Sequence, residues 1–389
     1  MNAGQTRLLT ALLSQPTAPF RETHVVRVVS EALKRCRVPH FQDPLGNLVV
    51  GAASRADYLR RVGQRRREPL RLFIAHMDHP GFHGRRWLAP GRLQVRWHGG
   101  SPVKHLAGAP VWLADEGGRV ADGRLTRVKI NKGGWAMDTA EVVLPAAAFA
   151  GTSRPAAKAL FGGFRFRRPV WRARGRVYAG AADDLAGVFV IVETARQLWR
   201  GGGKKDPPFL GLLTRAEEVG FVGAVGHLEL GWLQGRRRPV VCVSLEASRT
   251  LPGAEIGKGP VVRLGDRRTV FSADALKVLA DVAQKVLPRN HQRRVMDGGA
   301  CEATAATVYG LPTVGISIPL GNYHNQGLEG GPDCRGANGP APEFVSLADL
   351  EGELKLCKAL MRPDLDWSRP WQKQKALLQK NLKRYRPLL

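Results

Sequence analysis

The sequence predicts an α/β fold in which helices flank a central mixed sheet that carries a small inserted all-β domain. Apolar strand-like runs alternate with helical patterns in the first and last parts of the chain, whereas the middle has short β-type runs between Gly and Pro turns. The 389 residues suffice for about two or three domains. We therefore expect a discontinuous α/β domain at 1–83 and 175–389, and an inserted β domain at 84–174.

The first part of the chain combines two helical patterns with two strand-like runs. Pro44 and Gly46 predict a turn before the first strand. The second strand is apolar and carries His76 near its C-terminal end, so it delivers an imidazole to the end of a sheet where ligands bind in open α/β folds. The predicted elements are helices at 5–13 and 22–36 and strands at 48–50 and 70–78.

The middle of the chain lacks helical periodicity over most of its length. Gly-Gly and Pro turns separate short runs that are typical of strands in a small β domain. These runs lie at 93–97, 110–113, 127–130 and 141–144, and residues 164–169 are predicted to cross back to the α/β domain.

The α/β pattern resumes after Asp184. Ser272 is a predicted N-cap, and Ser346 with Asp349 forms the start of a capping box before the last long helix. From Arg362 the chain is basic and is expected to be peripheral. The elements predicted in this part are helices at 185–198, 274–287 and 347–360 and strands at 208–214, 239–245 and 313–318.

The chain is strongly basic, with a formal net charge of +27. Such a charge raises nucleic acid as a partner. The basic residues are dispersed, however, and the one local run, 64–67, stands in a polar connection without an aromatic stripe or a nucleic-acid-binding motif. We therefore interpret the charge as a solvated arginine-rich surface and do not predict nucleic acid as a partner.

Cysteine usage and hydropathy indicate a cytoplasmic chain. The five cysteines are scattered, odd in number and form no Cys-x-x-Cys pair, which fits a reducing compartment. No run approaches the roughly 18 apolar residues that a membrane span needs. The apolar part of the first 13 residues is too short for a convincing signal peptide, so we expect no membrane association.

Polar residues that can bind metals stand at the ends of the predicted strands or in adjacent turns. Carboxylates buried together without a cation are strongly disfavoured, and two divalent metal ions would resolve the conflict. A two-metal hydrolytic site needs one His and one terminal carboxylate per ion, a bridging carboxylate and a free carboxylate base. The candidates are His76, Asp183, Glu217, Glu218, Glu246 and His324.

Each candidate takes one role in that arrangement. Asp183 bridges the ions, one of which is bound by His76 and Glu246 and the other by Glu218 and His324. Glu217 stays free as the base that takes a proton from water and passes it to the leaving amine. Asp78 follows His76 by two residues and is predicted to accept the other ring proton of that histidine.

The same segments resemble the successive motifs of the glutamyl and tetrahedral aminopeptidases, in the clan of co-catalytic zinc peptidases. The order and spacing agree over nearly the whole chain, including the 43–47 turn and the 297–299 loop. The segments that carry the resemblance are 76–82, 182–187 and 216–220, then Glu246, and finally 318–320 with His324.

The resemblance implies an aminopeptidase that acts on peptides with two zinc or cobalt ions. It implies Glu217 as the base and a cis peptide bond between Asp183 and Asp184. It also implies large homo-oligomers, ring-like or tetrahedral, that assemble through the β domain.

Three departures from the family pattern bear on the substrate. Glu246 stands where aminopeptidases of the family usually have Asp, and Glu there is more typical of carboxypeptidases and deacylases of the clan. His79-Pro80 replaces the acidic-aliphatic pair that usually follows the metal-binding strand, and Cys301-Glu302 replaces the usual Thr-Asp pair. A carboxypeptidase or N-acyl amino acid deacylase therefore stays an alternative, as does an inactive polyanion-binding protein on the same fold. Cys301 is interpreted as a buried thiol.

Overall fold

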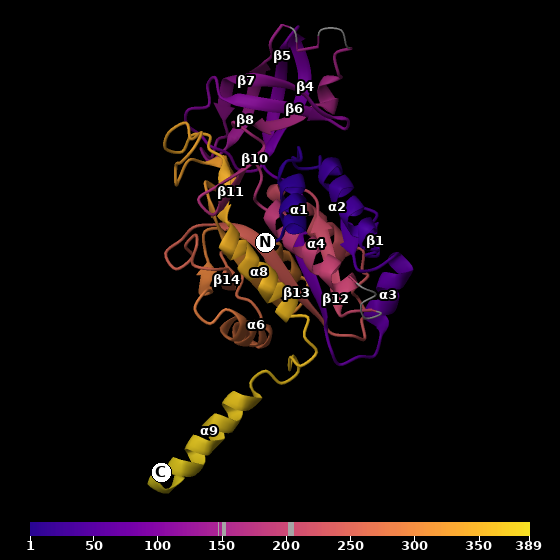
Figure 1. The fold of residues 1–389 in the computed structure, drawn as a ribbon, viewed down its shortest axis with the longest axis vertical. Coiled ribbons are helices and arrows are strands. Elements are labelled where there is room, and N and C mark those ends of the chain that lie inside the picture. Colours follow the sequence, from indigo (N-terminus) through magenta and orange to yellow (C-terminus); the bar gives the residue numbers. More distant parts are fainter. Residues whose placement is uncertain (147, 150–152, 201–205) are drawn as a thin grey trace.

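The computed structural model describes residues 1–146, 148–149, 153–200 and 206–389. Figure 1 shows three parts: a β-barrel at one end, a larger α/β body and a helix that projects from the opposite end. The predicted α/β fold with a central mixed sheet is confirmed, and a small closed β-barrel accompanies it.

The central sheet has 11 strands among the described residues. Its main path runs β1-β2-β12-β3-β13-β16-β17-β11-β10, and β14 branches from β16 and pairs with β15. The strands on the main path are β1 His40–Gln42, β2 Leu48–Val50, β12 Phe209–Thr214, β3 Leu70–His76, β13 Val240–Arg249, β16 Thr313–Gly321, β17 Glu343–Ser346, β11 Arg176–Ala179 and β10 Val170–Ala173. The branch consists of β14 Val261–Asp266 and β15 Gln292–Met296.

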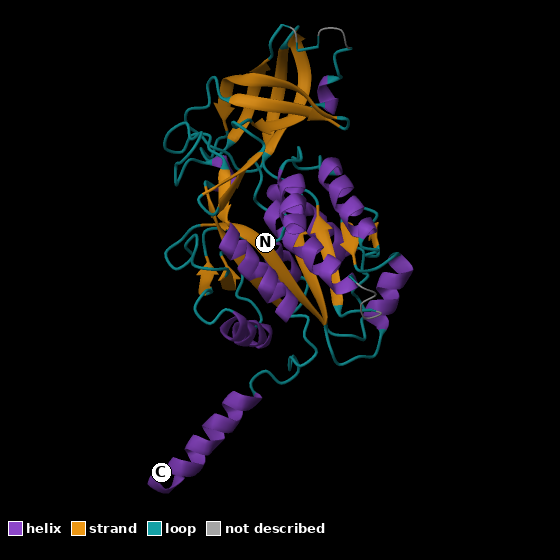
Figure 2. Cartoon of the chain, in the orientation of Figure 1, coloured by secondary structure: helices purple, strands orange, loops and turns teal. Residues whose placement is uncertain are grey.

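The middle strands β12, β3, β13 and β16 run parallel, so their carboxyl ends share one edge of the sheet. β3 is buried along its whole length because helices cover both of its faces. Phe73 and Ala75 pack in one core cluster with helices that lie on one face of the sheet, whereas Leu72 and Ile74 pack in a second cluster on the other face. The first cluster includes residues of α1 (Ala3–Leu13), α2 (Thr23–Arg35), α4 (Leu185–Trp199) and α8 (Leu347–Ala359), and the second includes residues of α3 (Arg55–Gly63), α5 (Val222–Glu229) and α7 (Glu302–Val308). Figure 2 shows this layered arrangement of strands and helices.

Two helices begin at the predicted caps. Ser272 accepts a hydrogen bond from the Ala275 amide at the start of α6, and Ser346 accepts one from the Asp349 amide at the start of α8. Asp184, which was not predicted as a cap, accepts one from the Gly187 amide at the start of α4. The helices are α1 Ala3–Leu13, α2 Thr23–Arg35, α3 Arg55–Gly63, α4 Leu185–Trp199, α5 Val222–Glu229, α6 Ala273–Val286, α7 Glu302–Val308, α8 Leu347–Ala359 and α9 Gln372–Tyr385. Short 3-10 turns occur at η1 Ala157–Ala159, η2 Glu217–Val219, η3 Tyr323–Asn325 and η4 Arg386–Leu388.

Six strands close the barrel in the order β4-β5-β8-β7-β6-β9. Gly162 allows two of its segments to approach closely, since a Cβ there would lie 2.1 Å from the Trp112 carbonyl oxygen. The strands are β4 Gly81–Ala89, β5 Arg92–His98, β6 Pro110–Asp115, β7 Gly118–Ile130, β8 Met137–Val143 and β9 Phe161–Phe164. The barrel thus begins at residue 81 and ends at 164, and β10 already pairs within the central sheet.

The basic C-terminal segment forms α9, which extends away from the body (Figure 1) and has no buried residue. None of the helices in the described part of the chain has the length and hydropathy needed to span a lipid bilayer.

Candidate metal centre

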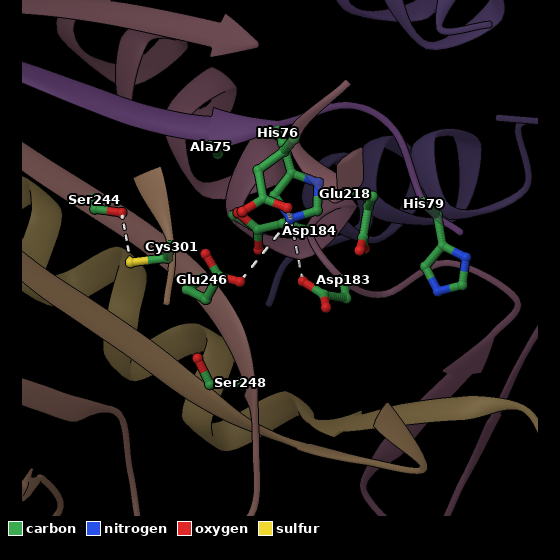
Figure 3. Close-up of polar contacts among 12 residues, drawn as sticks. Ala75, His76, His79, Asp183, Asp184, Glu218, Ser244, Glu246, Ser248 and Cys301 are labelled. Atoms are coloured by element: carbon green, nitrogen blue, oxygen red, sulfur yellow. Dashed lines mark hydrogen bonds and ion pairs between the residues drawn. The ribbon is translucent and has the colours of Figure 1, made fainter. Parts of the chain in front are cut away.

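The predicted metal-binding residues meet at the carboxyl edge of the parallel strands. Figure 3 labels four of them: His76, Asp183, Glu218 and Glu246. His76 ends β3, and Glu246 lies in the C-terminal half of β13. The others belong to connections that leave this edge: Asp183 precedes α4, Glu218 lies in η2 after β12, and His324 lies in η3 after β16. Parallel pairing therefore gathers residues that are far apart in the sequence.

His76, Asp183 and Glu246 form one potential metal-binding group. Nε2 of His76 lies 3.3 Å from Oδ1 of Asp183 and 4.0 Å from Oε1 of Glu246. One ligand atom from each of the three residues lies within 4.8 Å of the others, a spacing that could enclose one ion.

Asp183, Glu218 and His324 form a second group of the same kind. Nε2 of His324 lies 3.1 Å from Oε2 of Glu218 and 3.7 Å from Oδ2 of Asp183. Asp183 therefore presents Oδ1 to the first group and Oδ2 to the second. The two groups contain the residues predicted for the two ions, with Asp183 common to both.

Four polar atoms of these residues form no hydrogen bond within the protein. Within the described ranges, the buried atoms without a hydrogen-bond partner include His76 Nε2, Asp183 Oδ1, Glu218 Oε1 and Glu246 Oε2. Buried polar groups are almost always paired, so four such atoms on neighbouring side chains indicate a site that binds a ligand. Imidazole and carboxylate atoms suit a divalent cation, and the residues therefore fit a metal centre.

Burial and mutual repulsion raise the pKa values of these acids when no metal is bound. Desolvation, followed by the charge of Asp183, raises the pKa of Glu246 to about 8. The same two causes raise the pKa of Glu218 well above its usual range. A cation with two charges near Asp183 would reverse both shifts, because it favours the ionised carboxylates.

Glu217 lies beside the metal-binding groups. Its Oε2 is 3.9 Å from Nε2 of His76, and desolvation raises the pKa of Glu217 well above its usual range. His76, Glu217 and Glu218 also form a third group with metal-binding spacing. The geometry thus allows Glu217 either a direct contact with an ion or the position of a neighbouring base.

Asp78 contacts different atoms from those predicted. Its carboxylate accepts hydrogen bonds from the backbone amides of Glu217, at 2.9 Å, and Glu218, at 3.2 Å. Nδ1 of His76 instead pairs with the backbone carbonyl oxygen of Asp78 at 3.0 Å, and the carboxylate is 3.8 Å away. The prediction that the Asp78 side chain orients His76 is corrected: a backbone carbonyl orients the imidazole, and the carboxylate holds the η2 turn.

Glu343 is a buried residue of the site that the sequence interpretation missed. Its Oε2 accepts hydrogen bonds from the amides of Ala182, at 2.7 Å, and Asp183, at 3.0 Å. Its Oε1 accepts one from the His324 amide at 2.9 Å and lies 3.1 Å from Nε2 of His79. One carboxylate thus fixes the backbone at both sides of the second group. The feature of the sequence that could have indicated Glu343 as a site residue is its place at the start of the apolar segment 343–345.

The loop that carries Asp183 depends on tight backbone geometry. The peptide bond between Asp183 and Asp184 is cis, as the resemblance implies. Gly187 is required because a Cβ there would lie 2.3 Å from Oδ2 of Asp184. Asn322 and His324 adopt left-handed backbone angles, with φ of 56° and 54°, which turn the chain sharply at the other side of the site.

Cys301 behaves as a buried thiol. It is 1% exposed, and burial raises its pKa to about 12. Its Sγ lies 3.7 Å from Oγ of Ser244, a contact drawn in Figure 3. A thiol with such a pKa is not a thiolate nucleophile at neutral pH.

Comparison with known proteins relates this geometry to peptidases. A family model described as M42 glutamyl aminopeptidase matches residues 164–328. A search of curated proteins gives no match. Similar solved structures include the TET aminopeptidase of a marine sediment Thaumarchaeota archaeon, with 20% identity, TM-score 0.72 and coverage of 94% of this chain and 99% of the other.

Two further structures are similar to the same extent. An aminopeptidase from the archaeon Desulfurococcus kamchatkensis is 21% identical with a TM-score of 0.69, and the match covers 94% of this chain and 96% of that one. The TET1 peptidase of Pyrococcus horikoshii is 21% identical with a TM-score of 0.68, and the match covers 92% and 99%. At these identities the structures show a shared fold.

The family match and the shared fold confirm the resemblance that the motifs predict. The family match supports a hydrolase that acts as an aminopeptidase, and the metallopeptidase family that it matches implies divalent metals.

Proposed function

We propose that this chain is a dinuclear metal-dependent aminopeptidase that hydrolyses N-terminal residues from short peptides. The proposal depends on one observation: the two three-residue groups share Asp183, and each contains one further carboxylate and one histidine. A shared carboxylate between two His-carboxylate sets is the donor arrangement of two-metal hydrolases.

In this proposal His76 and Glu246 would hold one ion, Glu218 and His324 would hold the other, and Asp183 would be shared by both sets. When bound, the ions polarise the scissile carbonyl and lower the pKa of water from about 15.7 toward 7. Glu217 takes the proton of the attacking water and delivers it to the leaving amine. Asp78 and Glu343 keep the ligand-bearing turns in place through backbone hydrogen bonds.

Zinc is the metal we propose, with cobalt as the alternative, because imidazole and carboxylate ligands suit either ion. Metal analysis of the purified chain tests the number of bound ions, and an anomalous-scattering map tests where the ions bind. We expect two peaks flanking Asp183. A chain that stays active after exhaustive chelation would contradict the proposal.

Substrate panels separate this activity from its nearest alternative. The alternative is a carboxypeptidase or N-acyl amino acid deacylase, because Glu at position 246 is more typical of those enzymes. Metal-loaded protein should be incubated with amino-acid p-nitroanilides, dipeptides with a free carboxyl terminus and N-acetyl amino acids. We expect hydrolysis of the p-nitroanilides. Hydrolysis of only the dipeptides and the N-acetyl amino acids would contradict the aminopeptidase assignment.

Glu246→Asp tests how Glu246 affects this choice. The substitution restores the residue usual in the family and shortens the side chain by one methylene. A higher kcat/KM for p-nitroanilides would support the interpretation that Glu246 tunes the centre away from aminopeptidase activity. Metal content should be measured in parallel, because a lost ion would also change the rate.

We further propose a cytoplasmic homo-oligomer made of a catalytic domain, 1–83 and 175–389, and an inserted domain, 84–174, that contributes to assembly. The Pyrococcus horikoshii TET1 peptidase can assemble into a tetrahedron or a large octahedral shell, which supports the oligomer. Light scattering after gel filtration measures the mass. An inactive polyanion-binding protein would instead show salt-dependent nucleic-acid affinity that a chelator leaves unchanged.

A further inference from the structure

The C-terminal helix α9 carries an exposed apolar stripe together with a dense positive charge. The stripe consists of Leu378, Leu382 and Tyr385, which lie on one side of the helix because they are spaced by four and three residues. Their exposed fractions are 65%, 57% and 50%. Between 372 and 389 the chain has no Asp or Glu, and its basic residues are Lys373, Lys375, Lys380, Lys383, Arg384 and Arg386.

The described residues leave this stripe uncovered. α9 has no buried residue and extends away from the body (Figure 1). Its root is attached: Trp371, the residue before the helix, donates a hydrogen bond from Nε1 to Oδ1 of Asp274 at 2.7 Å. Helices of about this length gain most of their stability by packing an apolar face, so we expect the stripe to pack against a partner outside the described fold.

Two arginine runs that are far apart in the sequence lie together at the amino edge of the central sheet. Residues 65–67 precede β3, and residues 236–238 precede β13, which pairs with β3. The backbone amides of Arg237 and Arg238 both donate to the carbonyl oxygen of Val62, each at 3.1 Å. The second run is therefore held against the end of α3, directly before the first run.

The exposed side chains of these runs are unpaired. Within the part of the chain that the structure describes, the side chains of residues 65–67 and of Arg237 form no hydrogen bond and no ion pair. Glu68, the acid that follows the first run, is taken by Arg71 at 2.7 Å. Positive charges that gather without acids produce a field that attracts anions.

The arginine runs continue into the root of α9. Arg67 and Arg236, one from each run, line a single pocket together with Trp367 and Ser368 of the segment that leads into the helix. Trp367 packs against the hydrophobic core, which fixes this segment on the body. We call the two runs and α9 the basic end. It lies at the amino edge of the parallel strands, whereas the candidate metal centre lies at their carboxyl edge.

The apolar stripe separates an anionic lipid surface from other anionic partners. The phosphate backbone of a nucleic acid neutralises lysine and arginine but offers no apolar surface for a row of leucines. A second copy of α9 carries the same positive charges without an acid, so pairing two such helices sets like charges against each other. A helix with leucines on one side and basic residues around them is instead typical of the membrane interface.

We propose that the basic end binds an anionic phospholipid surface. The stripe of α9 inserts at the boundary between headgroups and acyl chains, and the two arginine runs contact the headgroups. Such binding needs neither a spanning helix nor a signal peptide, the two features whose absence underlies the prediction of no membrane association. The candidate metal centre stays accessible at the opposite edge of the sheet, and the proposal does not depend on the hydrolase function.

Flotation of the full chain with lipid vesicles tests the proposal. Vesicles made of equal parts of phosphatidylserine and phosphatidylcholine should be compared with vesicles of phosphatidylcholine alone, each at low and high salt. We expect at least about 10-fold stronger partitioning to the anionic vesicles, because each basic residue near the surface contributes about fivefold. This preference should decrease at high salt, since counterions screen the headgroups.

Leu378→Gln combined with Leu382→Gln removes the stripe but keeps the charge, and glutamine is also a good helix former. Partitioning to anionic vesicles should fall by at least about 10-fold, the order of magnitude for one leucine that is no longer buried. Trp135→Gln is the control, because Trp135 is a 61% exposed apolar residue of the barrel, at the other end of the molecule (Figure 1). It should leave the partitioning unchanged.

A charge-reversed pair tests the arginine runs separately. Arg66→Glu with Arg237→Glu should weaken partitioning to anionic vesicles by at least about 10-fold, whereas Arg66→Lys with Arg237→Lys should retain it. Equal weakening by both pairs would show that the runs do not act through their charge, and would overturn their part in the surface.

Several outcomes would overturn the lipid assignment. Equal partitioning to both kinds of vesicle is one, and unchanged partitioning of the leucine variant is another. A smaller particle mass of the leucine variant without lipid would show that the stripe joins copies of the chain. A lower Tm of that variant would show that α9 packs on its own body. Binding of duplex DNA that the leucine variant retains, without binding to vesicles, would assign the basic end to nucleic acid.

Discussion

Two regions of the molecule bury carboxylates beside histidines, with opposite consequences. Asp43 accepts hydrogen bonds from the amides of Leu45 and Asn47 and pairs with Nδ1 of His227 at 2.9 Å. Although burial alone would raise it, these partners lower the pKa of Asp43 below its usual value. Around Asp183 the acids are equally buried but lack such partners, and their pKa values are raised.

In these two regions, hydrogen-bond partners distinguish the acids that fix turns from the acids that could bind an ion. Asp43, Asp78 and Glu343 accept two or more backbone or side-chain hydrogen bonds each and fix turns. Glu218 and Glu246 have oxygens without partners, and each belongs to a potential metal-binding group that contains Asp183. The acids that fix turns have their hydrogen-bonding capacity satisfied by the protein. The acids around Asp183 would have theirs satisfied only when a cation is bound.

Asp183→Asn should have the largest effect, because Asp183 belongs to both groups. We expect fewer than about one bound metal per chain and no measurable hydrolysis, since each ion loses a charged ligand. Metal analysis after dialysis measures the first effect. Asp43→Asn is the control in the other region, and it should keep full metal content. Two tightly bound ions in Asp183→Asn would show that Asp183 is not a ligand shared by both groups.

Glu217→Gln should reduce kcat by about 10²- to 10⁴-fold while two metals stay bound, as expected for the loss of a general base. Steady-state kinetics and metal analysis on one preparation test both parts. Glu353→Gln is a matched change at a buried glutamate whose oxygens also lack partners but which belongs to no metal-binding group. Near-normal kcat in Glu217→Gln would show that the base is another residue.

Glu343→Gln should weaken the centre without removing a ligand. An amide nitrogen cannot accept the hydrogen bonds that one carboxylate oxygen receives, so the amides of Ala182 and Asp183, or that of His324, lose an acceptor. We expect metal affinity to fall by about 10- to 100-fold, as for other groups that orient ligands. Competition with a chelator measures this. Unchanged affinity together with an unchanged melting temperature would remove Glu343 from the site.

The pH dependence of the metal-free chain should give the smallest effect. Glu246 has a pKa of about 8 in the folded chain against 4.5 as its ordinary value, so the folded state binds more protons between these pH values. Stability must then fall as pH rises from about 5 to 8, and Tm should decrease by at least about 2 °C. Differential scanning calorimetry checks the slope. Glu246→Gln should flatten it, and the opposite slope in the wild-type chain would contradict the assignment.

The sequence predicted much of the fold and several of the polar side chains that meet at the candidate site. Helix starts at Ser272 and Ser346 follow from local capping chemistry, which needs only neighbouring residues. His76 and Glu246 could be recognised because buried parallel strands place their carboxyl ends at one edge. Strands β14 and β15 were not predicted, since their short mixed runs gain stability from pairing rather than from a clear local pattern.

Burial patterns and caps are local, so the order of residues specifies which side chains stand at the strand ends. The contacts of each buried acid, in contrast, depend on the tertiary structure. Glu343 meets the Asp183 amide across 160 positions, and Asp78 turns to the η2 amides instead of His76. Arg263 reaches a pocket beside Glu246 through the pairing of β14. Such contacts depend on how distant backbone segments approach, which the spacing of residues along the chain does not specify.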